Sequence, residues 1–218
     1  MTTQMLSCPG RLVMGNVHTP NPLDMNGKPR DKPQYFVALA VAKDHPGVSA
    51  MLTAIYQEAY MGYANQAAIL QRIQAFMQPG VQFAWKIGDG DDLKHKDNPG
   101  CPGHWIFKYS TVLPIQVVGP DNSPIEPAWL KTGYYADIYF SCAVNGKVDH
   151  TAGIYLNPLI ARLLGTAEEI HPGPVAKEVM GAAAQLGGAW TPPAGGMPPA
   201  PGIPGAAMPP APGIPGAG

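Results

Sequence analysis

Hydrophobic and polar positions alternate along several stretches of the chain, and one long stretch between them follows a helical repeat. Residues 33–42 place apolar side chains at every second position, as in a β-strand with one buried face. No proline occurs between Pro46 and Pro79, and apolar residues there recur every three or four positions. The proline at the start and the glycine at position 62 predict two consecutive helices in this stretch.

The other patterned stretches are mostly strand-like. Further strands are expected at residues 10–20, 81–87 and 104–119, the last of them one long strand or two strands broken at Pro114.

The end of the patterned region predicts a hairpin and a helix. Residues 133–156 contain Asn145-Gly146, a strong signal for a tight turn between two strands. The apolar run 158–170 resembles a short closing helix. Residues 1–172 are therefore expected to form a mainly β domain with a helical insertion. An OB-fold-like small barrel fits best, and the pattern also permits other small β architectures.

The composition changes near residue 180, beyond the last charged residue, Glu178. From Gly187 to Gly218, 19 of 32 residues are Pro or Gly, and MPPAPGIPGA occurs at 197–206 and again at 208–217. Such a segment buries too little apolar surface to offset its ordering entropy. Residues 173–218 are therefore expected to be a disordered, Pro/Gly-rich tail, a candidate for recruiting replication or recombination proteins.

Charge and cysteine content narrow the function classes. Only 13% of residues are charged and the formal net charge is −1, so any polyanion must be held by local cations. The three cysteines are widely spaced, which favours a reducing compartment over a disulfide framework. No stretch approaches the length of a membrane span or of a signal-peptide core.

Asp89, Asp91 and Asp92 form an acidic cluster that admits a catalytic interpretation. Two-metal nucleases gather carboxylates, but no second acidic motif accompanies this one. The residues also fail the spacing of an EF-hand loop, and Asp and Gly are ordinary turn formers. A solvated turn is the favoured interpretation, and a metal-dependent nuclease is retained as an alternative.

Other motifs for catalysis or metal binding are incomplete. The stretch GDGDDLK lacks the spacing of a phosphate-binding loop. Cys101 and His104 supply at most half of a zinc site, because no second pair has matching spacing. No local feature marks one cysteine as a nucleophile. No cofactor or metal is therefore expected.

Aromatic residues occupy both faces of the strands expected near residues 104–110 and 133–140. Because a barrel buries only one face of each strand, some of these rings should be exposed. Exposed rings beside lysines are what a single-strand binder needs, since every base can stack on a ring and cations neutralise the backbone. The alternative is that most of these rings form the core.

Three segments resemble, in order and spacing, a phage-encoded family of single-stranded DNA-binding proteins. They are KPQYFVALAVAKDHP, then KIGDGDD followed by GHWIFKYS, then GYYADIYFSCAVNGKVDHTAGIYLN, and the likeness covers residues 10–165. The resemblance implies an OB-fold, DNA binding without sequence preference, and a role in phage replication or recombination in the cytoplasm of an infected bacterium. It also implies that the D-G-D element is a structural loop, with Lys86 as the basic residue before it.

Two features depart from the family pattern. Asp137 stands where many relatives carry a basic residue, and the chain ends in the uncharged PGAG rather than an acidic tip. Recruitment of partners through an acidic tip is therefore not expected.

The sequence thus predicts a non-enzymatic protein that binds single-stranded DNA, with homo-oligomerisation left open. A structural virion or scaffold protein, with the tail as a spacer, is the other alternative. Stacking is assigned to Tyr35, Trp85, Trp105, Phe107, Tyr109, Tyr135 and Tyr139. Phosphate contacts are assigned to Arg30, Lys32, Lys86, Lys94, Lys96 and Lys108.

Overall fold

The computed structural model describes residues 5–24, 27–78 and 80–171. In chain order its elements are β1 (Pro9–Leu23), β2 (Pro29–Ala42), α1 (Pro46–Gly62), α2 (Ala67–Gln74), β3 (Ile87–Asp89), β4 (His104–Thr111), β5 (Gln116–Val118), the short 3-10 helix η1 (Pro127–Trp129), β6 (Tyr135–Val144) and β7 (Ile154–Gly165). The Pro/Gly-rich tail predicted for 173–218 lies outside the described residues, so its proposed roles stay predictions.

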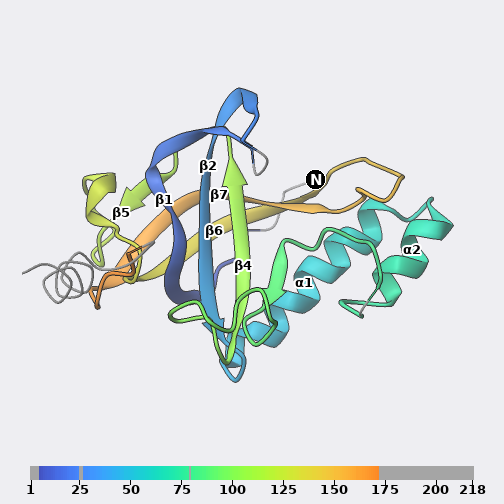
Figure 1. Ribbon diagram of the computed structural model, residues 1–218, viewed down its shortest axis with the longest axis horizontal. Coiled ribbons are helices and arrows are strands. Elements are labelled where there is room, and N and C mark those ends of the chain that lie inside the picture. The colour runs from blue at the N-terminus through green and yellow to red at the C-terminus, as the bar shows by residue number, and fades with distance from the viewer. Residues whose placement is uncertain (1–4, 25–26, 79, 172–218) are drawn as a thin grey trace, which may run out of the picture. The chain divides into compact units, whose positions relative to one another are not determined.

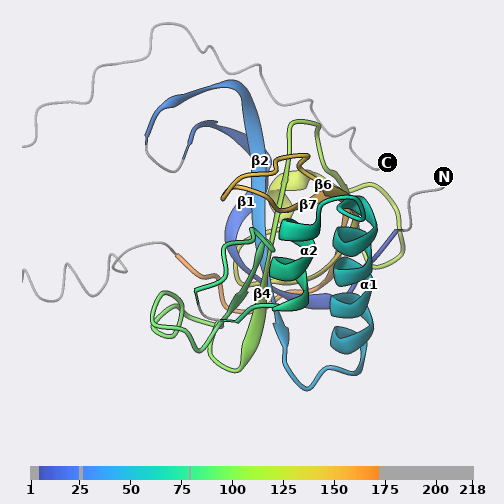
Figure 2. The same cartoon turned by 90° about the vertical axis from the view of Figure 1, so that its right-hand side faces the viewer.

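One sheet contains all seven strands, in the order β3-β4-β2-β1-β6-β7-β5. Every neighbouring pair is antiparallel except β5 and β7. The sheet curls until β4 and β7, which are not neighbours in the ladder order, contact each other. Figure 1 shows the long central strands with α1 and α2 together on one side, and Figure 2 shows the same strands curving behind the helices. The predicted mainly β, OB-fold-like architecture with a helical insertion is confirmed.

The main core fills the inside of the curled sheet and extends under α1. Val37, Leu39 and Val41 supply the β2 side, and α1 contributes Val48, Met51, Ile55 and Ala59 at helical spacing. α1 begins with Pro46 in its first turn, and its N-cap His45 accepts a hydrogen bond from Gly47 N. The prediction of two helices separated at Gly62 is confirmed.

A glycine in β1 allows the backbones of β1 and β2 to approach closely. Gly15 has φ +78°, and a Cβ there would lie 2.0 Å from the carbonyl oxygen of Phe36. Only glycine fits this position. The tight approach fixes the part of β2 that carries Phe36.

Two predicted elements are corrected. Residues 158–170 do not form a helix, because most of this run belongs to β7, which pairs with β6 from Tyr135↔Gly165 to Val144↔Ile154. Strand pairing has overridden a helix-compatible composition. The predicted strand at 81–87 is reduced to a bridge between Ala84 and Gly153, and β3 begins only at Ile87.

Two other predictions hold in modified form. The chain is broken at Pro114, so β4 ends at Thr111 and β5 pairs instead with β7. The β6–β7 hairpin forms, but residues 145–153 connect its strands in place of a two-residue turn. Asn145 anchors this longer connection, since its Oδ1 accepts hydrogen bonds from Lys147 N and Tyr63 OH.

Candidate nucleic-acid interface

β2 and β4 separate their side chains into an inner face, toward the main core, and an outer face. Their antiparallel register pairs Phe36 with Ser110 and Ala38 with Lys108, all four on the outer face. Part of the outer face is covered as well, because Ala38, Ala40 and Ile106 lie in a second, smaller apolar cluster. The inner face carries Trp105, Phe107 and Tyr109. In the middle of these strands, aromatic residues with the parity of Phe107 and Tyr109 are therefore buried, whereas Phe36 has the opposite parity and is exposed.

Burial corrects three of the seven predicted stacking residues. Phe107 and Tyr109 are fully buried and Trp85 is 5% exposed, so no base can reach their rings. Tyr109 packs edge-to-face on Phe140, with ring centroids 5.0 Å apart. The ring centroids of Trp85 and Phe76 are 4.6 Å apart. These rings stabilise the core, as the alternative interpretation of the aromatic pattern had it.

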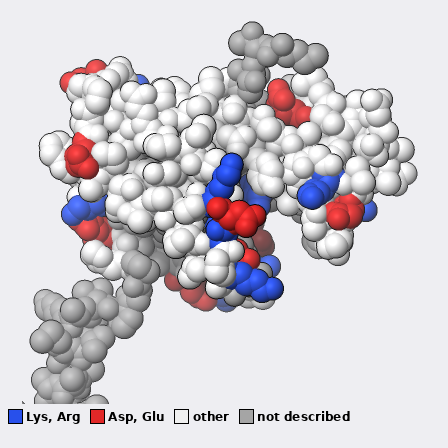
Figure 3. Space-filling view, turned by 90° about the horizontal axis from the view of Figure 1, so that it is seen from above, with Lys and Arg blue, Asp and Glu red and all other residues white. Residues whose placement is uncertain are grey.

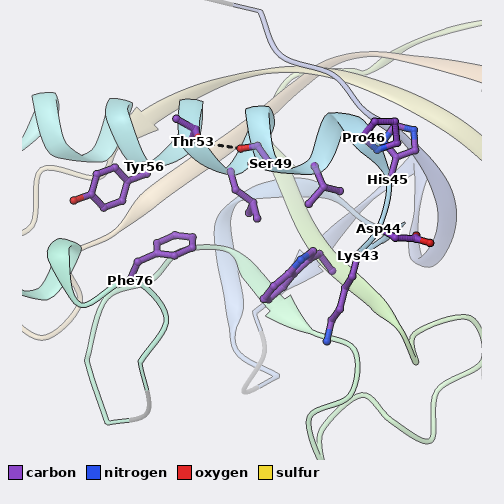
Figure 4. A pocket seen from close by; sticks show the side chains of 11 residues that line it. Lys43, Asp44, His45, Pro46, Ser49, Thr53, Tyr56 and Phe76 are labelled. Atoms are coloured by element: carbon purple, nitrogen blue, oxygen red, sulfur yellow. Dashed lines mark hydrogen bonds between the residues drawn. The ribbon is translucent and has the colours of Figure 1, made fainter.

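Trp105 has an intermediate position. It is partly exposed and lines a cavity of ≈ 590 Å³ between α1 and the end of β2, which Figure 4 shows with Tyr56 and Phe76 facing each other at one end. The Lys43 ammonium lies 5.2 Å from the Trp105 ring centroid. The cations of the outer face do not line this cavity, so Trp105 is separated from them.

The other three predicted stacking residues are partly or well exposed. Tyr35 is half-buried and packs on the main core, whereas Tyr135 is 49% exposed on β6. The Tyr139 ring lies 5.6 Å from the Arg162 guanidinium, which also donates to the buried Asp137 carboxylate at 3.0 Å. Asp137, which departs from the family pattern, is thus held by a cation on the neighbouring strand.

Among the described residues, the sequence interpretation missed four exposed aromatic residues, Phe36, Tyr60, Trp129 and Tyr155, and two of these lie beside cations of the outer face. Phe36 is 37% exposed on the outer face of β2, and Tyr155 is 43% exposed on β7. Phe36 carried a usable signal, because it has the opposite parity to Val37, Leu39 and Val41, the large apolar side chains of β2 that enter the main core. The Lys86 ammonium lies 5.9 Å from the Tyr155 ring centroid.

Lys86, Lys94, His95 and Lys108 gather on the outer face and are called the cation cluster below. Lys108 Nζ lies 3.3 Å from His95 Nε2, and Lys108 N donates to Lys86 O at 2.8 Å. Burial lowers the pKa of Lys108, and repulsion from Lys86 and Lys94 lowers it further. Lys86 itself has φ +59°, a strained backbone for a residue other than glycine. Among the described residues no member of the cluster forms an ion pair within 4.0 Å.

The remaining predicted phosphate ligands, Arg30, Lys32 and Lys96, are not members of this cluster. Arg30 donates to Leu23 O and to Gln34 Oε1, each at 2.9 Å, and so braces the β1–β2 hairpin. Lys32 and Lys96 are exposed. Figure 3 shows one face of the molecule, where cations and acids are interspersed and most of the surface is uncharged.

Two of the three clustered aspartates are structural. Lys43 Nζ lies 2.6 Å from Asp89 Oδ1 and 2.7 Å from Asp91 Oδ2, and these three residues are called the acid clamp below. Asp91 Oδ1 also accepts from Gly103 N at 2.8 Å, which joins the two ends of loop 90–103. Hydrogen bonds from Lys43 lower the pKa of both aspartates. The clamp thus holds the loop that carries Lys94 and His95 against the outer face.

This geometry does not favour the nuclease alternative. The Asp89 and Asp91 carboxylates already bind an ammonium group, and the described residues contain no group of three or more His, Cys, Asp or Glu side chains placed to hold a metal ion. Burial raises the pKa of Cys8 to about 11 and that of Cys142 to about 12, so neither thiol is an activated nucleophile. No helix in the described ranges is both long and apolar enough to cross a membrane.

Comparison with solved structures identifies the fold. It is the fold of phage single-stranded DNA-binding proteins. The protein from bacteriophage Enc34, solved in complex with single-stranded DNA, has a TM-score of 0.57 and 17% identity over 77% of this chain and 89% of its own. The gp2.5 protein of bacteriophage T7, also a single-stranded DNA-binding protein, has a TM-score of 0.56 and 15% identity over 78% of this chain and 96% of its own. No protein-family model and no curated protein sequence matches the chain.

Proposed function

We propose that this protein binds single-stranded DNA without sequence preference, and that it coats bare strands during phage DNA replication or recombination. The observation that carries the proposal is the unpaired cation cluster on the outer face of β4, flanked by exposed aromatic rings. Phe36 lies on the neighbouring strand beside it, and Tyr155 lies against Lys86. The likeness in fold to two phage proteins that bind single-stranded DNA supports the same function.

The proposed path runs from Tyr155 past Lys86 and Lys108 to Phe36. Lys86 links Tyr155 to Lys108, since its side chain lies over Tyr155 and its carbonyl accepts from Lys108 N. Stacking on exposed rings is worth about 1–3 kcal/mol per base and tolerates any sequence. The cations contribute the salt-dependent part of the binding free energy. Chemistry on the DNA is not part of this proposal.

The earlier candidates enter the proposal in three groups. Lys86, Lys94 and Lys108 form its centre. Arg30, Lys32 and Lys96 are outer phosphate ligands, reached if the strand continues along the β1–β2 hairpin or loop 90–103. Tyr35, Trp105, Tyr135 and Tyr139 stay candidate contacts for a strand that bends around the barrel, and Trp85, Phe107 and Tyr109 are withdrawn.

Fluorescence anisotropy tests the function directly. Labelled 30-mer single strands of several sequences and a matching duplex are titrated with the full chain at two salt concentrations. We expect tight, salt-sensitive binding to every single strand and weaker binding to the duplex. Equal binding to both forms, or none, would contradict the proposal, and magnesium-dependent cleavage lost in Asp91→Ala would favour a nuclease instead.

A second titration tests the stacking site. Phe36→Ala should weaken single-strand binding by about 5- to 100-fold, the equivalent of one lost stacked base. Tyr60→Ala is the matched control, because Tyr60 is also an exposed ring, 40% exposed, but lies on α1. Thermal unfolding of both variants shows whether the fold is intact. Equal losses of affinity in the two variants would remove Phe36 from the interface.

A further inference from the structure

The hydrogen bond between Lys108 and His95 fixes the protonation state of the histidine. An ammonium group only donates, so His95 Nε2, 3.3 Å from Lys108 Nζ, accepts and the proton of the neutral ring is on Nδ1. That Nδ1 is buried and has no hydrogen-bond partner among the described residues. Burial lowers the pKa of His95 and repulsion from Lys108 lowers it further. His95 is therefore neutral while the cluster is empty.

The charges that surround His95 are mostly positive. From its own loop, Lys94 repels the imidazolium form and Asp92 alone attracts it. From β4 the only charged neighbour is Lys108, and Cys101 beside it is a neutral thiol because burial raises its pKa. Among the described residues, burial and the two lysines outweigh Asp92 and disfavour a second charge at this point. An anion that contacts both nitrogens would reverse that balance.

β3 passes directly beside this pair. A Cβ at Gly88 would lie 3.2 Å from His95 Nε2 and 3.6 Å from Lys108 Nζ, so any larger residue at this position would crowd both nitrogens. Lys86 and Lys94 repel Lys108, and among the described residues no carboxylate pairs with these lysines within 4.0 Å. Lysines gathered without a carboxylate partner are the arrangement expected for binding an oxyanion rather than for a structural ion pair.

We propose that Lys86, Lys94, His95 and Lys108 form one phosphate-binding site, in which His95 holds the phosphate as an imidazolium. On binding, Lys108 transfers its hydrogen bond from His95 Nε2 to a phosphate oxygen, and His95 takes a proton from solvent and donates Nε2–H to the same phosphate. Binding of single-stranded DNA is then coupled to the uptake of one proton. This inference rests on the proposed DNA-binding function and assigns one phosphate of the strand to a defined pocket.

The direction in which affinity for DNA changes with pH follows from the linkage between proton binding and phosphate binding at His95. A bound phosphate raises the pKa of His95 above its value in the free protein, so affinity increases as the pH falls through that interval. Each unit by which the pKa rises corresponds to about a tenfold gain in affinity at low pH. We expect the affinity for single-stranded DNA to increase by about three- to tenfold when the pH is lowered from 8 to 5.5. A variant without the histidine should show no such increase.

The experiment is a pH series of anisotropy titrations at constant ionic strength, using labelled oligo-dT and the full chain. Wild type should show the gain, and His95→Gln should bind at all pH values as wild type does at pH 8. His150→Gln is the matched control, since His150 is exposed on the connection 145–153, and it should titrate like wild type. Gly88→Ala, which places a methyl group against His95 and Lys108, should also flatten the pH profile.

The outcomes separate the two proposals. Absence of binding at every pH would contradict the proposed function. Binding with the same pH profile in wild type and His95→Gln would keep the function and overturn the phosphate site. An independent readout is the NMR titration of the His95 ring with and without inorganic phosphate, in which phosphate should raise its pKa. An unchanged pKa would overturn the site without reference to DNA.

Discussion

Loop 90–103 lies between two charge clusters that are built in opposite ways. In the acid clamp, one lysine contacts two carboxylates, and each charge has its partner within 2.7 Å. In the cation cluster, three lysines and a histidine gather, and the hydrogen bond that joins two of their side chains is the 3.3 Å contact of Lys108 with His95. The clamp begins at the end of β2, whereas the cluster is built from the loop, β4 and the residue before β3.

The difference separates charges that hold the fold from charges that are available to a ligand. In the clamp the Lys43 ammonium is already paired with two carboxylates, so it is not available to bind an anion. Asp91 also accepts a hydrogen bond from the Gly103 amide. The unpaired cations repel each other and so cost the folded state free energy. A cluster that is unfavourable when empty is most simply explained by a bound anion that compensates it.

Removing the cation cluster should have the largest effect on binding. In Lys86→Gln/Lys108→Gln, we expect affinity for single-stranded DNA to fall by about 10- to 100-fold at 0.1 M salt, because two charged contacts to phosphate are lost. The slope of log K against log salt should decrease by about 1.4, at about 0.7 per phosphate contact on a single strand. Titrations at four salt concentrations measure both quantities.

The same variant should keep or gain thermal stability, because like-charge repulsion is relieved. Lys28→Gln/Lys147→Gln removes an equal charge from exposed positions elsewhere and should leave the affinity within about twofold of wild type, as an exposed cation without phosphate contact acts only through a screened field. Equal losses in the two double variants would mean that net charge, not the cluster, determines binding.

Breaking the acid clamp should have a smaller and different effect. Lys43→Met leaves Asp89 and Asp91 facing each other without their cation, so loop 90–103 should detach more often from the outer face. We expect the melting temperature to fall by on the order of a few degrees. Affinity should fall by a few-fold with an unchanged salt slope, because the phosphate ligands are displaced rather than removed.

Lys131→Met is the matched control for this clamp variant. It breaks another exposed lysine–carboxylate pair, with Glu169 at 2.6 Å, at a place remote in sequence from the loop. It should lower the melting temperature slightly and leave the affinity unchanged. A clamp variant that binds DNA as well as wild type would show that the loop keeps its position without Lys43.

Local patterns in the sequence could be predicted, whereas contacts between segments far apart in the chain could not. The parity of β2 and the helical repeat of α1 are local properties, so the barrel and its insertion followed from spacing alone. Which face of β4 is inside depends on its pairing with β2, so Phe107 and Tyr109 were assigned to the wrong side. Spacing also cannot show that Lys43 reaches Asp89 and Asp91, since that contact joins the end of β2 to a loop more than forty residues later.

The smallest expected effect is on the pH dependence of folding stability, which should differ between the two clusters. Burial and Lys108 lower the pKa of His95 in the folded state, so the unfolded chain binds more protons below about pH 6.5 and stability falls as the pH falls through the folded pKa. Lys43 lowers the pKa of Asp89 and Asp91, so the stability they contribute is present above about pH 4 and is lost only as the pH falls through their folded pKa values. Urea unfolding from pH 7.5 to pH 3 should therefore show two steps of lost stability.

Two variants assign these steps. His95→Gln should remove the step near neutral pH and keep the acid one, and Lys43→Met should do the reverse, because each deletes the interaction that shifts the group concerned. His150→Gln, at an exposed histidine, should change neither step. If His95→Gln instead keeps the upper step, the histidine is not forced to stay neutral by its neighbours. The cation cluster would then lack the internal repulsion that distinguishes it from the clamp.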